Sequence, residues 1–189
     1  MEDSNSNLPR SGNANKASVF ISYSRDDLAF ADHLDVALDL AGFDPILDRH
    51  GIHGAEDWEG KLGTLIRDAD TVVFVLSPSS AVSEACAWEV KRAGELSKKI
   101  IPVVARSLGE TRAPPDLAKL NYIYFYPEPK KPGSGVRSGS EELIKALKLD
   151  LAWMQKHTRY LQRAVEWRDG ERNPHRLLSG NEDIVAAKT

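Results

Sequence analysis

The chain has 189 residues, of which 41% are apolar and 28% charged, a composition typical of a globular domain with a core of its own. Its formal net charge of −3 argues against a nucleic-acid-binding surface, which needs an excess of Lys and Arg. A single cysteine, Cys86, excludes an internal disulfide and fits a reducing compartment. No apolar run reaches the roughly 18 residues of a membrane span, so we expect a cytoplasmic protein with no membrane contact.

The N-terminal part of the chain predicts a leader, a strand and a helix. Residues 1–16 are polar and lack the apolar centre of a signal peptide, so a disordered leader is expected there. The run "SVFIS" at 18–22 predicts a buried strand. Apolar residues at helical spacing over 28–41, followed by Gly42, predict a helix and its end. Ser24 and Asp27 have the spacing of a capping box before this helix.

The middle of the chain contains the strongest strand signal. "FDPIL" at 43–47 predicts a second strand, and its Pro45 favours a position at the sheet edge. A loop rich in turn formers separates it from a helix predicted over 58–68. The run from Val72 to Leu76 is apolar at every position, which indicates burial on both faces and hence a central parallel strand.

The remaining predicted elements continue the alternation of strands and helices. They are a helix over 83–97, strands at 99–105 and 122–126, a helix capped by Ser140, and a long helix from 149 to about 168. This alternation predicts an α/β fold with helices on both faces of a parallel sheet. Five strands favour the flavodoxin-like order 2-1-3-4-5. Residues 151–189 are expected to form a helical extension or linker toward a further C-terminal module.

Common phosphate-binding, metal-binding and nucleophile motifs are missing from the sequence. It contains no G-x-G-x-x-G, no G-x-x-x-x-G-K-[ST], no C-x-x-C, no H-E-x-x-H and no G-x-S-x-G. The five histidines show no metal-ligand spacing. We therefore expect no metal and no bound cofactor. Cys86 is interpreted as a packing residue, because a nucleophilic cysteine would need a positioned base.

Three segments together resemble a Toll/interleukin-1 receptor (TIR) domain. They are "SVFISYSRDD", then "FDPILDRHGIHGAEDWEGKL", and finally "VVFVLSPSSAVSEACAWEV" followed by "KKIIPVV". The second segment is similar to the BB loop of that family, with Asp48, Ile52, Gly54 and Trp58 at the expected positions. The resemblance covers about residues 17–150, which we take as the TIR domain.

The resemblance implies an activity. Many bacterial, plant and animal TIR domains hydrolyse NAD⁺ at the nicotinamide ribosyl bond, and some cyclise the ADP-ribose product. The family's catalytic glutamate lies in a pattern similar to S-x-x-C-x-x-E, which Ser83, Cys86 and Glu89 match. Many relatives carry Trp directly before that Cys, where this chain has Ala85, and the indole stands instead at Trp88. The resemblance thus implies NAD⁺ as the substrate and a role of the protein in bacterial immune signalling.

Topology offers an independent reason to place Glu89 in a site. Its helix follows the central strand, so the first turns of the helix lie over the carboxyl edge, where doubly wound folds bind ligands. Glu89 is about 60° around the helix axis from the sheet-facing Cys86. The alternative is that Glu89 has no functional role and is an exposed carboxylate, which the helix dipole stabilises near the start of the helix. With Glu89 as catalytic residue, we expect the substrate to contact Ser22, Tyr23, Arg25, Asp48, Ile52, Gly54, Trp58, Ser83, Cys86 and Trp88.

Several of these residues also have structural interpretations that the sequence leaves open. Trp58 and Trp88 suit ordinary packing, and Asp48 suits an Asx-type turn. For the whole chain, the alternative to an enzyme is a non-catalytic module that binds other TIR domains or mimics innate-immune adaptors. The resemblance further implies that other TIR domains are partners, with homo-oligomers formed through the BB loop. No nucleic acid partner is expected.

Overall fold

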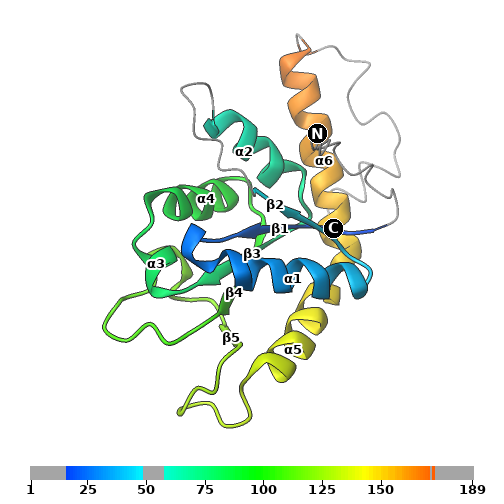
Figure 1. Cartoon of the computed structure of the whole chain (residues 1–189). Coiled ribbons are helices and arrows are strands. Elements are labelled where there is room, and N and C mark those ends of the chain that lie inside the picture. Colours follow the sequence, from blue (N-terminus) through cyan, green and yellow to red (C-terminus); the bar gives the residue numbers. More distant parts are fainter. Residues whose placement is uncertain (1–15, 49–57, 171, 173–189) are drawn as a thin grey trace, which may run out of the picture.

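The structure, a computed structural model, describes residues 16–48, 58–170 and 172, without the side chain of Trp58. Five parallel strands form one sheet in the order β2-β1-β3-β4-β5, as Figure 1 shows. The strands are β1 Ser18–Ser22, β2 Asp44–Leu47, β3 Thr71–Leu76, β4 Lys99–Val104 and β5 Ile123–Tyr124. The predicted flavodoxin-like order is confirmed, with the Pro45 strand at an edge.

Helices cover both faces of this sheet (Figure 1). They are α1 Leu28–Leu40, α2 Trp58–Asp68, α3 Pro78–Ala81, α4 Glu84–Glu95, α5 Val136–Lys148 and α6 Leu151–Asp169, with short 3₁₀ turns η1 Arg25–Asp27 and η2 Pro115–Leu117. Alternate side chains of a strand point to opposite faces, so Val19 and Ile21 pack with Leu34 of α1 and Leu143 of α5. Phe20 faces the other way, toward α2 and α4.

Strand β3 is buried at all six positions. Its side chains serve both cores, since Val73 contributes to the α1 and α5 side while Val72 and Phe74 contribute to the α2 and α4 side. Each fully buried side chain of this kind contributes about 1.5–3 kcal/mol to folding. This burial explains why the segment reads as a continuous apolar run, and it fixes β3 at the centre of the sheet.

The predicted capping box of Ser24 and Asp27 is wrong. Ser24 precedes η1 and makes no capping hydrogen bond with its side chain, and Asp27 makes none at the start of α1. The Asp27 carboxylate instead accepts a hydrogen bond from the hydroxyl of Ser77 at 2.5 Å and pairs with Arg106 at 3.0 Å. Tertiary partners therefore replaced the local cap.

The helix predicted to start at Ser140 begins earlier, at Val136. Ser140 lies inside α5, where its hydroxyl donates to the carbonyl of Val136 at 2.8 Å. The early start depends on Gly139, because a Cβ at that position would lie 2.8 Å from the carbonyl oxygen of Tyr124. The glycine lets the first turn of α5 approach the backbone of β5, a long-range requirement that local spacing does not reveal.

Helix α6 is separated from α5 by a two-residue break. Leu149 is extended, and Asp150 adopts the left-handed conformation with φ of 60°. The chain thus changes direction before α6, which runs beside the end of α2 (Figure 1). Within the described residues, no helix has the length and apolar character of a membrane span.

Candidate active site

Glu89 lies in α4, which follows β3 and begins over the carboxyl edge of the sheet. The residue is only 8% exposed, so Glu89 is not an exposed carboxylate at the start of a helix, which was the alternative to a functional role. The hydroxyl of Ser22, the last residue of β1, donates a hydrogen bond to Glu89 Oε2. The α4 side chains toward the sheet are Cys86, Val90 and Ala93. Glu89 therefore flanks the sheet-facing row and meets the end of the neighbouring strand.

The environment of Glu89 favours its neutral form. Burial is the largest influence and raises the pKa of the carboxyl group from its ordinary 4.5 to about 7. The Ser22 hydrogen bond opposes this rise, the negative charge of Asp48 adds to it, and the positive charge of Arg25 opposes it. The carboxyl group is therefore close to half ionised at neutral pH, and two charged residues that the sequence predicted for the site act on it.

Arg25 and Asp48 form an ion pair at the rim of this site. Arg25 Nη2 lies 3.3 Å from Asp48 Oδ2, and the hydroxyl of Tyr23 donates to the backbone carbonyl of Asp48 at 2.9 Å. Tyr23 and Arg25 follow β1, and Asp48 follows β2. The two loops are thus tied together at the carboxyl edge, as expected for adjacent parallel strands.

Ser83 and Cys86 have structural contacts that explain their spacing. Ser83 is the N-cap of α4, and its hydroxyl accepts the backbone N–H of Cys86 at 3.3 Å. Cys86 is buried in a cluster with Phe74, Leu76 and Val90. Burial raises the pKa of its thiol to about 11, so the thiol stays protonated at neutral pH and is a poor nucleophile. The packing interpretation of Cys86 agrees with these contacts.

The indole of Trp88 lies on the α2 side of α4. It packs against the cluster of Phe20, Leu62 and Ile66, and its ring is 3.7 Å from the position that a Cβ on Gly63 would occupy. Its interpretation as a packing residue therefore has contacts to support it. Of the other predicted ligand contacts, Ile52 and Gly54 lie outside the described residues, as does the side chain of Trp58.

A buried polar cluster next to the site escaped the sequence interpretation. Asp27 is 2% exposed and joins Ser77 at the end of β3 to Arg106 after β4. The negative charges of Glu89 and Asp27 both help to raise the pKa of Cys86, so both carboxyl groups act on that buried thiol. The one sequence signal for this buried cluster was the second acidic residue of "SRDD", Asp27, which the capping-box prediction assigned to a helix cap.

The arrangement suits the stabilisation of positive charge. A carboxylate held by a hydroxyl in a buried setting interacts more strongly with a cation than it would in water. The described part of the chain contains no group of three or more His, Cys, Asp or Glu side chains placed to hold a metal ion.

The structure is thus an α/β domain with a flavodoxin-like sheet. Its candidate site lies where the parallel strands end, and the buried side chain of Glu89 is part of it. The sequence model of the TIR domain matches residues 19–137, more than half of the chain. The chain therefore belongs to the TIR domain family, as its three sequence segments predicted. No curated protein sequence matches it significantly.

Solved structures of several classes are similar to this chain. A prokaryotic SEFIR domain has 20% identity and a TM-score of 0.50, over 69% of this chain and 97% of the other. The TIR domain of a Toll-related receptor from Hydra magnipapillata has 22% identity and a TM-score of 0.49, over 57% and 82%. A CMP N-glycosidase from Clostridium botulinum has 20% identity and a TM-score of 0.42, over 70% and 98%. At such identities the SEFIR likeness supports the fold alone.

Proposed function

We propose that this TIR domain is an NAD⁺ glycohydrolase with Glu89 as its catalytic residue. The observation that carries the proposal is a buried carboxyl group, hydrogen-bonded by Ser22, beside the Arg25–Asp48 pair at the carboxyl edge. Strained or buried titratable groups with shifted pKa values concentrate at functional sites. Membership in a family that includes NAD⁺-cleaving enzymes supports the same assignment.

The chemistry requires one bond to break and one to form. The bond between ribose C1′ and the nicotinamide nitrogen breaks, and its electron pair leaves with nicotinamide, which becomes neutral and needs no acid. The ionised Glu89 stabilises the cationic ribose that develops, as carboxylates do in glycoside hydrolysis. Water then forms a bond to C1′ and releases a proton, giving ADP-ribose. Attack by a group of the adenine in place of water gives a cyclic product.

Neighbouring residues have roles that follow from their chemistry. The Arg25 guanidinium is suited to a phosphate of the substrate, since it presents fixed donors to anionic oxygens. Tyr23 offers a ring face at the rim. We propose that assembly with other TIR domains through the segment after Asp48 completes the site, so activity increases with local concentration.

The test is nicotinamide release from NAD⁺ by the concentrated or crowded protein. Glu89→Gln keeps the shape of the side chain and removes its charge, so we expect turnover to fall by about 100-fold or more. Glu84→Gln is the matched control, because Glu84 is an exposed residue in the first turn of the same helix. Equal turnover by the parent chain and Glu89→Gln would remove Glu89 from the mechanism.

A non-catalytic TIR interaction module is the alternative function. In that case the Ser22–Glu89 bond serves only to join α4 to β1, and Trp88 serves only the α2–α4 contact. The parent chain would then form assemblies without releasing nicotinamide at any concentration. Light scattering and the nicotinamide assay on the same samples separate the two functions.

A further inference from the structure

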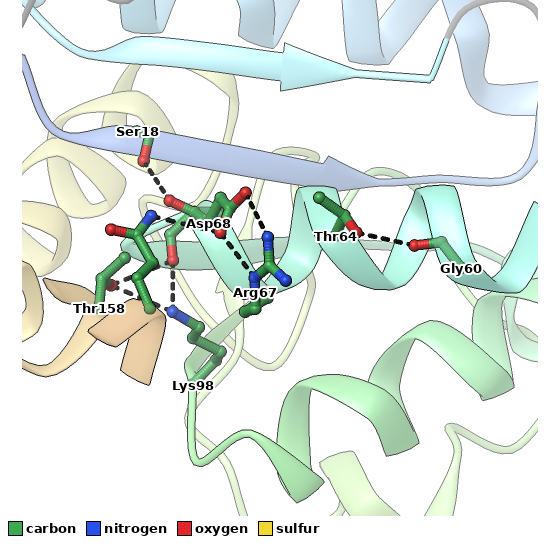
Figure 2. A network of polar contacts seen from close by, with 9 residues as sticks. Ser18, Gly60, Thr64, Arg67, Asp68, Lys98 and Thr158 are labelled. Atoms are coloured by element: carbon green, nitrogen blue, oxygen red, sulfur yellow. Dashed lines mark hydrogen bonds and ion pairs between the residues drawn. The ribbon is translucent and has the colours of Figure 1, made fainter. Parts of the chain in front are cut away.

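Helix α6 is attached to the domain at the edge of the sheet opposite Glu89. Lys98 and Ala69 precede β4 and β3, at the amino ends of these strands. Lys98 Nζ donates to the carbonyl of Ala69 at 2.8 Å and to the hydroxyl of Thr158 at 3.1 Å. The Thr158 hydroxyl donates in turn to the same carbonyl at 3.3 Å. Figure 2 shows Thr158 of α6 facing Lys98 in this network.

A second polar contact joins α6 to the last residue of α2. Gln162 Nε2 donates to Asp68 Oδ1 at 3.2 Å, and the same carboxylate is held by Arg67 at 2.8 Å. Thr158 and Gln162 are four residues apart and therefore lie on one face of α6. This face ties α6 both to the end of α2 and to the strand connections beside it (Figure 2).

The α6 interface combines polar contacts with a few apolar side chains. Met154 and Thr158 of α6 are buried, and Leu161 and Val165 are half-buried. The main polar partner, Lys98, is a buried cation that water would solvate readily. Releasing α6 therefore exposes one buried apolar side chain, Met154, together with groups that hydrate well. Polar contacts of this kind are typical of elements that open reversibly.

The two residues between α5 and α6 can serve as a pivot for α6. Lys99 Nζ donates to the carbonyls of Ala146 and Leu149, at 2.9 Å and 2.8 Å, and so holds the end of α5. The next residue, Asp150, is in the left-handed conformation that non-glycine residues seldom adopt. The direction of α6 thus depends on one unusual backbone conformation while α5 remains fixed.

Helix α2 is the element that would respond to release. It has 11 residues and includes Gly60 and Gly63, which are weak helix formers, so it depends on its neighbours for order. Trp88, one position before Glu89, packs against Leu62 and Ile66 of α2, and in the sequence the segment before α2 follows Asp48. One end of α2 therefore meets α6, and its middle packs on the helix that carries Glu89.

We propose that α6 is a releasable latch: its docking through Thr158 and Gln162 keeps α2 ordered, and its release slows cleavage at the Glu89 site. The statement about cleavage rests on the function proposed above, whereas the ordering of α2 does not. Coupling of this kind needs an element with two arrangements that both sites influence, and α2 has that position.

The experiment compares hydrogen exchange and nicotinamide release in the full chain. Thr158→Arg places a second cation against Lys98 and should release α6. Its matched control is Gln155→Arg, at an exposed position of the same helix. In Thr158→Arg, we expect amides of α6 and of α2 to exchange about tenfold faster or more, as for the loss of a hydrogen bond to a charged group. Amides of β3 should be unchanged, and turnover should fall several-fold.

The possible outcomes separate the latch from the enzyme. Unchanged exchange in α2 after α6 has been released would overturn the latch, and so would unchanged exchange in both helices. If amides of β3 also exchange faster in Thr158→Arg, the substitution has disturbed the whole domain. Thr158→Val, which keeps the volume and removes the hydroxyl, then replaces it, and the exchange rates of α6 and α2 are compared in the same way. A parent chain that releases no nicotinamide refutes the proposed activity, while the exchange data still decide the ordering of α2.

Discussion

The hydroxyl of Ser22 donates to the carboxyl group of Glu89 across 67 positions of sequence. One partner ends β1 and the other lies in α4, so this single bond joins the strand next to the centre with the helix that follows the central strand. The contact gives Glu89 a fixed position at the carboxyl edge. Under the proposed function, Ser22 would act on the reaction through Glu89.

Removing the Ser22 hydroxyl should therefore weaken activity in a pH-dependent way. The hydrogen bond lowers the pKa of Glu89, so Ser22→Ala should raise that pKa further and reduce turnover at pH 7. Turnover should recover in part at higher pH, where Glu89 is ionised again. The loss of a hydrogen bond to a charged group also costs about 1.5–3 kcal/mol of unfolding free energy.

The control for this prediction is Ser24→Ala, since Ser24 makes no capping hydrogen bond with its side chain. The measurement is nicotinamide release between pH 6 and pH 9 for both variants. A uniform loss of turnover at every pH would show that Ser22 does not act through the ionisation of Glu89.

The raised pKa of Glu89 also predicts how stability depends on pH. The folded protein binds the Glu89 proton more tightly than the unfolded chain, whose carboxyl group has an ordinary pKa of 4.5. The favourable contribution is thus complete below pH 4.5 and is lost as pH rises through about 7. Under the proposed function, turnover should have the opposite dependence and fall below pH 7, because it requires the ionised form.

Glu89→Gln should remove this pH dependence and so be more stable than the parent above pH 7. The expected difference in unfolding free energy is about 3.5 kcal/mol at most, from a pKa difference of about 2.5 at roughly 1.4 kcal/mol for each pH unit. Urea denaturation at pH 5 and pH 8 measures it. A difference that does not grow between these two values would mean that Glu89 has an ordinary pKa.

Arg25 and Asp48 should shift the pH profile of turnover in opposite directions. The positive charge of Arg25 lowers the pKa of Glu89 and the negative charge of Asp48 raises it. Arg25→Met should therefore move the acidic limb of the profile to higher pH, and Asp48→Asn should move it to lower pH. Since the ion pair is partly exposed, either change should cost less than about 1 kcal/mol of stability. Shifts of the same sign would contradict this electrostatic account.

Cys86 should behave as a packing residue. Its thiol is buried and its pKa is raised to about 11, so iodoacetamide should label the folded protein far more slowly than the urea-unfolded chain. Cys86→Ala should lower stability by about 1–2 kcal/mol through the small cavity it leaves. Turnover should remain within about threefold of the parent, a change below the scale of catalytic effects. Rapid labelling of the native protein would require an open thiol and would overturn this interpretation.

Two glycines should respond oppositely to the same substitution. Gly139→Ala places a Cβ 2.8 Å from the carbonyl oxygen of Tyr124, so it should lower the unfolding free energy by about 1–3 kcal/mol. Gly94, in α4, has no atom within 4 Å of the added Cβ, and Gly94→Ala should raise stability by up to about 1 kcal/mol. Thermal denaturation of the two variants measures both effects. A stabilised Gly139→Ala would mean that α5 can move away from β5 at no cost.

By itself, the sequence determined the order of strands and helices, the central place of β3, the edge place of β2, and the position of Glu89 over the carboxyl edge. These features follow from local apolar patterns and from the right-handed connections of parallel sheets, which leave few alternatives. Only the tertiary structure decided which side chains meet at that edge. Ser22 and Glu89, Asp27 and Ser77, and Lys98 and Thr158 are pairs of polar groups far apart in the chain, and such partners are selected by burial, which leaves no local periodicity in the sequence.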